Sequence, residues 1–400
     1  MKPRATYYLL RASFALFYRM WLTVTLLYHA EMVTTDPLLL ILLSVVHEGT
    51  VFLFEVPTGI VADSYSRKWS TIIGLLMIGS AYCLEGSAPI YGRVLLAQFI
   101  YGVGFTFFSG ANDAWIADEI GPEQAAPVFM RGTQISLIFG QIGIISAIVI
   151  GQFGVQVPLI VAGIAIIVLG LFLAIVMREE GFSPEKTTSG VRAKLMNTVR
   201  QSRMALRTQP LLLNVVLVGF VVGTTGGFDR LFTPHFLSYE PQMDAVIWYG
   251  LLEAAISLAS AVVLEAIRRR ATTLSSEQVP RTIALLYLGT IVGNIVFVLA
   301  GNFGMAIMAF WFSQMFRNTT RPLIIIWINQ FAESRIRATA ISMYWQSNAL
   351  GQVVGSPFVG LIGRLFSLRV ALMASVLALS PTLWLLTRNH DVGKSTPIQS

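Results

Sequence analysis

The sequence predicts an all-α membrane protein in which twelve transmembrane helices form two pseudo-symmetric six-helix bundles. Three observations lead to this fold class. Apolar residues make up 55% of the 400-residue chain and charged residues only 12%, about half the charged share of an average soluble domain. Apolar stretches recur at lengths that can cross a bilayer. Polar motifs of the first half return in the same order in the second half.

The composition excludes three other classes of protein. A soluble chain of this size needs far more charge to cover its surface, and a disordered chain has far fewer apolar residues. Cys83 is the only cysteine, so a fold held together by internal disulfides is excluded. In a membrane protein, the formal net charge of +7 reports the orientation of the chain rather than nucleic-acid binding.

Twelve stretches are long and apolar enough to span a bilayer, which takes about 20 mostly apolar residues. Arg11 and Arg19 interrupt the first stretch, and no small-residue cleavage site follows it, so we do not expect a cleavable signal. Glycines recur inside the fifth and eleventh stretches at spacings that let helix backbones approach closely. The predicted spans are 8–30, 37–62, 69–87, 91–118, 130–154, 156–177, 211–237, 245–267, 281–300, 303–331, 338–363 and 369–388.

The basic residues indicate how these spans are oriented. If both termini are cytoplasmic, 20 of the 28 Lys and Arg residues lie in cytoplasmic loops, three lie at the opposite helix ends and five lie inside helices. Cytoplasmic loops of membrane proteins carry an excess of Lys and Arg. The sequence therefore predicts a multi-pass protein of the cell membrane with both termini in the cytoplasm.

The longest polar segment, 178–209, lies midway along the chain. It divides an N-terminal six-helix bundle, 1–177, from a C-terminal one, 210–400. Val191, Leu195 and Val199 are spaced as one face of a basic helix, which predicts a cytoplasmic linker with an amphipathic helix lying on anionic headgroups. A regulatory docking site is the alternative interpretation.

Three matches between the halves indicate a duplicated six-helix unit. The Asp-x-x-x-Arg of 63–67 returns 202 residues later as the Glu-x-x-x-Arg of 265–269. The segment Arg-Gly-Thr-Gln-Ile-Ser at 131–136 returns 206 residues later as Arg-Ala-Thr-Ala-Ile-Ser at 337–342. A Trp-Ile pair leads into polar residues before each of these six-residue segments. Repeats of this kind are typical of secondary transporters.

The loop after the second span carries a recognisable motif. It reads Gly59-Ile-Val-Ala-Asp63-Ser-Tyr-Ser-Arg67-Lys68, a glycine, an aspartate and a basic pair at fixed spacing. This resembles the signature loop between helices two and three of the major facilitator superfamily. The twelve predicted helices, the six-plus-six repeat and the long central loop also resemble that family, so the likeness covers the whole chain. The glycine that the family often has two residues after the aspartate is replaced here by Tyr65.

The resemblance implies that this loop is a conformational latch between the two halves. Arg67 and Lys68 can bridge to Asp118 or Glu119 at the end of the fourth span, and Asp63 can pair with a basic group or cap an opposing helix. A positive-inside turn with solvated charges is the alternative. The predicted latch residues are Gly59, Asp63, Arg67, Lys68, Asp118 and Arg131.

Charged groups inside the spans are the next evidence, because each costs about 3 kcal/mol unless it faces a partner or a cavity. Most lie in spans one, four, seven and ten, which line the central path in the six-plus-six arrangement. Residue counting places Asp113 between the depths of Arg19 and Arg11, so an ion pair between spans one and four is feasible, and it brings Asp229 within reach of Arg317. Structural pairing between helices is the alternative. The predicted substrate- or proton-binding residues are Arg19, Glu48, Asn112, Asp113, Asp229, Arg317 and Arg321.

Several chemistries have no motif in this sequence. We find no phosphate-binding loop, no metal-ligand spacing and no catalytic serine pattern, so we expect neither an enzyme, nor a cofactor, nor ATP-driven transport. The resemblance implies a monomeric secondary active transporter that works by alternating access. Its likeness to bacterial drug exporters implies efflux of a small organic molecule across the lipid bilayer, driven by protons.

Two patterns of drug antiporters are absent. Gln98 occupies the place of their helix-four arginine, and no proline follows Gly143 in the fifth span. A metabolite or sugar symporter or uniporter of the same fold is therefore one alternative, and a membrane sensor that does not transport is another.

Overall fold

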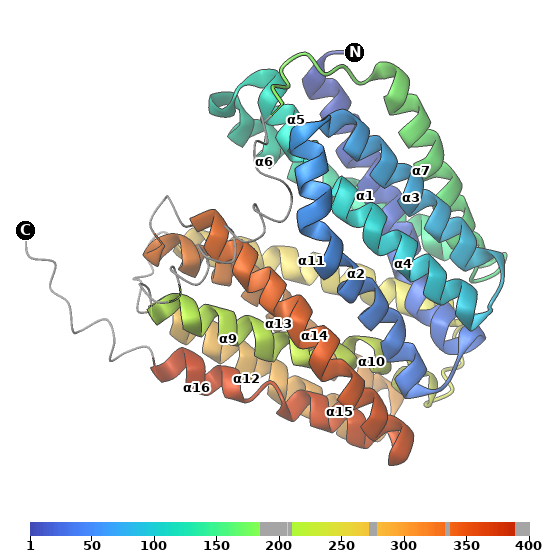
Figure 1. The fold of residues 1–400 in the computed structure, drawn as a ribbon. Helices are drawn as coiled ribbons and strands as arrows, with labels where there is room; N and C mark the ends of the chain where they lie inside the picture. Colours follow the sequence, from blue (N-terminus) through green and yellow to red (C-terminus); the bar gives the residue numbers. More distant parts are fainter. Residues whose placement is uncertain (185–205, 207–209, 272–277, 333–336, 389–400) are drawn as a thin grey trace, which may run out of the picture. The chain divides into compact units, whose positions relative to one another are not determined.

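The structure is a computed structural model that describes residues 1–184, 206, 210–271, 278–332 and 337–388. Every regular element in these ranges is helical (Figure 1). Nine helical segments among them are long and apolar enough to cross a membrane. Together with the long helices α1, α13 and α14, they account in order for the twelve predicted spans. The predicted fold class is confirmed.

The described part of the first compact unit contains residues 1–35, 46–184 and 243–253. The helices α2 and α11 each contribute only part of their length to it. Its elements are α1 (Pro3–Tyr28), the π-helical turn η1 (His29–Val33), α2 (Pro37–Ser64), α3 (Arg67–Ser87), α4 (Tyr91–Phe108), α5 (Ala111–Ile120), α6 (Pro122–Gly151), α7 (Val157–Val176) and α11 (Ala245–Ala271).

The second unit holds the first part of α2, the last part of α11 and the helices that follow the central segment. The predicted amphipathic helix around 191–207 falls outside the described residues. The further elements of this unit are α9 (Pro210–Thr224), the 3-10 turn η2 (Thr225–Gly227), α10 (Phe228–Leu237), α12 (Gln278–Leu299), α13 (Phe303–Phe331), α14 (Arg337–Leu365), α15 (Leu368–Leu377) and α16 (Pro381–Thr387).

The two units share one packing pattern. In the first, α1 packs along α6, and α3 packs against both α4 and α7. In the second, α9 packs along α14, and α12 packs against α13, α15 and α16. When the six spans of each repeat are numbered from one to six, both units pack span one against span five. In both units, span three packs against spans four and six. The duplication predicted from short motifs is therefore present in the helix packing.

Glycines on matching helices allow close helix contacts in each unit. A Cβ atom on Gly143 of α6 would collide with the backbone carbonyl of Leu16 on α1. A Cβ atom on Gly351 of α14 would collide with the carbonyl of Phe220 on α9. A small residue at such a place lets two backbones touch, which is how helices associate where lipid removes the hydrophobic driving force.

The exposed faces of several helices are apolar. Leu137 and Ile145 of α6 and Ile164 and Ile175 of α7 are all more than half exposed. Leu285 of α12 is exposed in the same way in the second unit. Contiguous apolar faces of this extent are unfavourable in water and suit a hydrocarbon surrounding.

Two helix boundaries differ from the predicted spans. The predicted span 91–118 is divided into α4 and α5 around Gly110, whose φ of 80° favours glycine. Helix α6 begins at Pro122, eight residues before the predicted start, after Gly121 with a φ of 84°. Proline suits the first turn of a helix because its missing N–H would be unpaired there anyway.

The tenth predicted span, 303–331, contains a proline at position 322. Helix α13 runs through this proline without interruption. The hydroxyl of Thr319 donates to the carbonyl of Met315 at 2.8 Å, and that of Thr320 donates to the carbonyl of Arg317 at 2.7 Å. Pro322 leaves the carbonyl of Asn318 without its backbone donor, and these hydroxyls bond to other carbonyls of the preceding turns.

Candidate functional site

An ion-pair cluster lies in the first unit, at the loop between α2 and α3. The guanidinium of Arg67 lies 2.6 Å from the carboxylate of Asp118 on α5 and 3.6 Å from that of Asp63 on α2. It also donates to the backbone carbonyl of Ala114 at 2.9 Å. Arg67 therefore joins α2, α3 and α5 through one side chain, and the predicted Arg67–Asp118 bridge is present.

The chain that leaves α7 covers this cluster. The carboxylate of Glu179 accepts from the Ser66 hydroxyl at 2.5 Å and from the backbone N–H of Lys68 at 2.9 Å, so it caps the first turn of α3. The carboxylate of Glu119 accepts from the backbone N–H groups of residues 180 and 181. The ring of Phe182 lies 5.9 Å from the Arg67 guanidinium.

The other predicted latch residues lie around the cluster or outside it. The ammonium of Lys68 lies over the ring of Trp69, 5.5 Å from its centre. Gly59 belongs to α2, one turn before Asp63. Arg131 of α6 is exposed and donates to Gln134 on its own helix at 3.4 Å, which is a contact separate from the Arg67 cluster.

The predicted polar groups of the first unit find partners other than the expected ones. Arg19 of α1 lies 3.8 Å from Glu253, on the part of α11 that belongs to this unit. Asp113 accepts a hydrogen bond of 2.8 Å from the hydroxyl of Tyr7. The expected pairing of Arg19 with Asp113 is thus replaced by two contacts in which each residue has a different partner.

Two further predicted residues of the first unit are Asn112 of α5 and Glu48 of α2. Asn112 is buried and donates to the carbonyl of Phe108 at 3.0 Å, while its side-chain oxygen has no hydrogen-bond partner among the described residues. Glu48 of α2 is half-buried and lies within electrostatic reach of Tyr101 on α4.

In the second unit, the predicted pairing of Asp229 with Arg317 is present. Both terminal nitrogens of Arg317 on α13 contact the two carboxylate oxygens of Asp229 on α10, one of them at 2.5 Å. A bidentate pair of this kind fixes both side chains and is stronger than a single hydrogen bond. Arg321, one turn further along α13, is exposed and lies within electrostatic reach of Tyr344.

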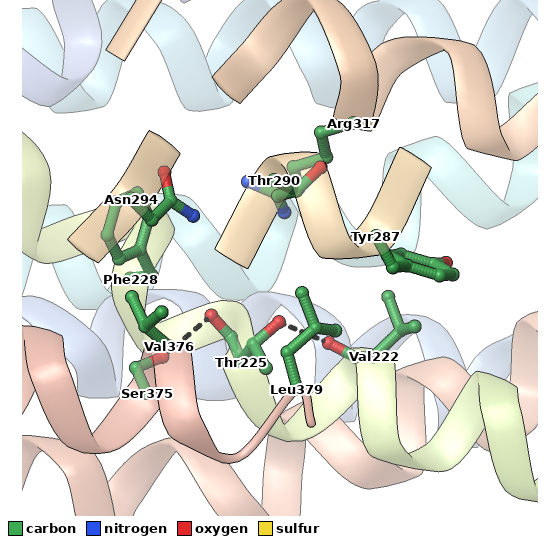
Figure 2. Close-up of a pocket in the computed structure, with 10 residues that line it drawn as sticks. All are labelled: Val222, Thr225, Phe228, Tyr287, Thr290, Asn294, Arg317, Ser375, Val376 and Leu379. Atoms are coloured by element: carbon green, nitrogen blue, oxygen red, sulfur yellow. Dashed lines mark hydrogen bonds between the residues drawn. The ribbon is translucent and has the colours of Figure 1, made fainter. Parts of the chain in front are cut away.

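Arg317 also lines a small cavity inside the second unit. Figure 2 shows the polar side chains of α12 on one side of it and those of η2 and α15 on the other, with the Ser375 hydroxyl donating to the Thr225 carbonyl at 3.2 Å. The cavity measures about 20 Å³, which is room for one water molecule. It is lined by Val222, Thr225, Phe228, Tyr287, Thr290, Asn294, Arg317, Ser375, Val376 and Leu379.

The most enclosed charged group of the first unit was missed by the sequence analysis. Glu85 of α3 is 1% exposed, and its carboxylate accepts from Trp21 at 3.1 Å, Thr25 at 2.5 Å and Gln98 at 3.3 Å. The imidazole of His29 lies 2.7 Å from the same carboxylate. We refer to these five side chains as the Glu85 cluster.

A signal for the Glu85 cluster was present in the sequence. A glutamate inside an otherwise apolar stretch, 69–87, is costly unless it has partners. Its position two residues before the predicted end of the span made it resemble an interfacial charge. Its donors lie 60 and 13 residues away, on α1 and α4, so only the packing of the helices brings the cluster together.

Comparison with known proteins gives one consistent result. A family model described as Major Facilitator Superfamily matches residues 9–276. The uncharacterized MFS-type transporter YxaM of Bacillus subtilis (strain 168) is 21% identical over 335 residues, which cover 82% of this chain and 81% of that protein.

Solved structures share the fold at low sequence identity. A bacterial homologue of the human lysosomal transporter Spinster has a TM-score of 0.77 at 13% identity, with 98% of each chain covered. The nucleoside transporter NupG has a TM-score of 0.73 at 15% identity and covers 99% of this chain and 100% of that one. A POT family transporter in complex with 5-aminolevulinic acid has a TM-score of 0.73 at 13% identity, covering 98% and 96%.

Duplicated helical units with apolar outer faces and paired charges inside define a multi-pass membrane transport protein rather than an enzyme. The family model covers well over half of the sequence. The chain therefore belongs to the Major Facilitator Superfamily.

Proposed function

We propose that this protein is a proton-coupled secondary transporter that exports a small organic molecule across the cell membrane by alternating access, as a monomer with both termini in the cytoplasm. The single observation that carries the proton coupling is the Asp229–Arg317 pair beside the cavity of the second unit. The direction follows from the resemblance to bacterial drug exporters, and the orientation follows from the distribution of basic residues.

The pair supplies a simple exchange reaction. While Asp229 is ionised, its two oxygens hold the Arg317 guanidinium. A proton on Asp229 removes one of the two charges and leaves Arg317 without its counter-ion. A guanidinium inside a membrane protein then needs another anionic group, such as a substrate carboxylate, or a different conformation. Proton binding and substrate binding would thus be coupled through one arginine.

The Arg67 cluster supports alternating access. It ties together three helices at one end of the first unit through a partly exposed ion pair, in which Arg67 is 22% and Asp118 27% exposed. Contacts of this strength can form and break in each transport cycle, since partly exposed pairs contribute only about 1 kcal/mol. We assign this cluster the latch role.

Import of a metabolite is the second candidate. Among the structural neighbours are a nucleoside transporter and a POT family transporter in complex with 5-aminolevulinic acid, which indicates that this fold also carries polar metabolites. Guanidinium groups at Arg317 and Arg321 would suit a substrate that bears a carboxylate or phosphate.

A flux panel in proteoliposomes tests both candidates. Cationic drugs, nucleosides, sugars, amino acids and organic anions are offered with and without an imposed pH gradient. The proposal expects transport of at least one organic compound that stops when the proton gradient is collapsed and that moves protons in the opposite direction. Protons moving with the substrate would favour the metabolite symporter, flux that ignores the gradient would overturn proton coupling, and ligand binding without flux would favour a sensor.

A further inference from the structure

The Glu85 cluster holds a buried carboxylate with all of its acceptor positions occupied. Trp21 and Gln98 can only donate to it through their N–H groups, and Thr25 donates its hydroxyl to the oxygen that His29 also contacts. Two donors on each oxygen match the four lone-pair positions of an ionised carboxylate. The arrangement therefore stabilises Glu85 in its charged form.

One ring nitrogen of His29 contacts this carboxylate, and the other has no hydrogen-bond partner among the described residues. Its Nε2 lies 2.7 Å from Glu85, so Nε2 carries a proton and donates, because a carboxylate only accepts. Its Nδ1 is buried without a hydrogen-bond partner among the described residues, and the side chain is 2% exposed. An unpaired polar atom this deep is rare in native proteins and calls for a reason.

We propose that the His29–Glu85 pair is a proton-binding site of the first unit, with Nδ1 of His29 as the atom that takes up the proton. The reaction balances simply: one O–H bond of a hydronium ion breaks as the Nδ1–H bond forms, and a neutral water molecule is left. The pair changes from a net charge of −1 to zero. Histidine is the side chain best suited to this exchange near neutral pH.

Neither state of the site is fully satisfied in this packing. Without the extra proton, Glu85 has donors but no counter-charge in a membrane-embedded interior. With it, the imidazolium balances the charge, but the new Nδ1–H has no acceptor among the described residues. Proton uptake thus favours a rearrangement in which Nδ1 meets water. His29 is the first residue of the π-helical turn η1, a kind of turn often found at functional sites.

The titratable groups that lie against the Glu85 cluster are phenols. Tyr28 of α1 donates to the Glu85 carbonyl at 2.9 Å. Tyr82 of α3 and Tyr101 of α4 flank the indole of Trp21, Tyr82 in a stack at 4.3 Å. Cys83 of α3 is directed instead at the backbone of α7, and Glu31 of η1 is exposed. Phenols are neutral near pH 7 in their ordinary state, so Glu85 is the charged group in direct contact with His29.

The second unit contains a natural control for His29. His235 lies 206 residues later, near the end of α10, and is also 1% exposed. Its Nε2 lies 3.3 Å from the backbone carbonyl of Phe297 on α12, two residues before the end of that helix, as Glu85 is on α3. The repeat thus places a histidine at the same helix contact with a carbonyl in place of the carboxylate.

The test is the titration of the ring nitrogens of His29. The full-length protein is labelled with ¹⁵N-histidine, placed in lipid nanodiscs, and followed by NMR from roughly pH 5 to 9, the range in which histidine titrates. The sequence contains four histidines, and the spectrum of His29→Gln identifies the signals of residue 29. We expect Nδ1 of His29 to change from bare to protonated within this range.

The glutamate provides the second arm of the experiment. Glu85→Gln should reduce the protonation of Nδ1 of His29 across this pH range, because it removes the carboxylate that balances the charge of the imidazolium. His235→Gln should leave the protonation of His29 unchanged. If Glu85→Gln cannot be purified, proton uptake measured between the two pH limits decides: the wild type should bind about one proton more than His29→Gln.

Two outcomes would overturn the site: a His29 ring that stays in one protonation state throughout, or a protonation of His29 that is the same in the wild type and in Glu85→Gln. Its role in transport rests on the proposed proton coupling, but the two can fail separately. Flux that ignores the proton gradient, together with a titrating His29, would leave a proton site without coupling. Proton-driven flux with a silent His29 would leave the coupling to Asp229.

Discussion

The guanidinium of Arg67 lies 2.6 Å from the carboxylate of Asp118 but 3.6 Å from that of Asp63. The nearer partner lies 51 residues away on α5, and the farther one lies one helical turn away, across the α2–α3 junction. The long-range contact is thus the shorter one. It is this pair, more than the aspartate of the loop motif itself, that ties the loop to another helix.

We predict that Asp118→Asn slows transport more than Asp63→Asn does. Removing the shorter, partly buried pair in Asp118→Asn should reduce turnover about tenfold, equivalent to about 1.4 kcal/mol. Removing the local pair in Asp63→Asn should reduce turnover only about twofold. Substrate affinity should change little in both. Initial rates and equilibrium binding of the substrate found in the flux panel measure this. The control is Glu180→Gln, which removes an exposed pair with Arg178; equal effects of the two aspartates would contradict the assignment.

We predict that Asp229→Asn abolishes the response of transport to a pH gradient. The amide cannot take up a proton in this range, so Arg317 loses a partner whose charge can be switched. Exchange of labelled for unlabelled substrate, which needs no net proton movement, should persist. Glu240→Gln makes the same change of charge in an exposed loop and should behave as the wild type. A gradient response that survives in Asp229→Asn would place the coupling proton elsewhere.

Arg317→Lys should resemble this variant more than the wild type. A lysine keeps the positive charge but cannot make the two parallel hydrogen bonds to Asp229 that the guanidinium makes. We expect gradient-driven uptake to fall at least about tenfold, a change of about 1.4 kcal/mol. Uptake assays with and without the gradient give the ratio of gradient-driven to passive uptake. A ratio equal to that of the wild type would show that a positive charge at position 317 is enough for coupling.

Gly143→Ala and Gly351→Ala should each destabilise the protein by about 1–3 kcal/mol, the usual cost of overpacking. In both, the new methyl group meets a backbone carbonyl that belongs to another helix and cannot rotate away. Thermal unfolding of the purified protein in detergent measures the effect. Gly92→Ala is the matched control, because a Cβ atom there has no neighbour within 4 Å among the described residues, and it should unfold at the wild-type temperature.

Glu179→Ala should loosen the first turn of α3. The variant removes the carboxylate that accepts from Ser66 and from the backbone N–H of Lys68, a cap worth about 1 kcal/mol. Hydrogen exchange should rise at residues 67–71 and remain unchanged at the far end of α3. Glu180→Ala, one residue on and largely exposed, should change neither. Equal exchange in both variants would show that Ser66 alone caps this helix.

The length of the apolar stretches and the spacing of the motifs predicted much of this molecule. Every span was found in order, because apolar stretches of sufficient length have few alternatives in lipid. The Asp229–Arg317 and Arg67–Asp118 contacts were also anticipated, since depth along a helix follows from residue counting. Neither prediction needed the angles between helices.

The interior of the Glu85 cluster could not be predicted in this way. Nothing in the sequence distinguishes Trp21, Thr25 and Gln98 as partners of a buried glutamate. They point toward one carboxylate only because of how α1, α3 and α4 are rotated about their axes. The same limit explains why Arg19 was assigned to Asp113: residue counting gives depth but not direction. The break at Gly110 was missed because a glycine in a spanning helix is common and its φ value is not written in the sequence.

Helix α3 carries the Arg67 contact at its first residue and Glu85 two residues before its last. At 1.5 Å per residue the two charges lie about 27 Å apart along a single straight rod, which is close to the hydrocarbon thickness of a bilayer. A rigid helix of this length changes its tilt along its whole length at once. Breaking the ion pair at one end of α3 and exposing the imidazole at the other end would then be two consequences of the same tilt.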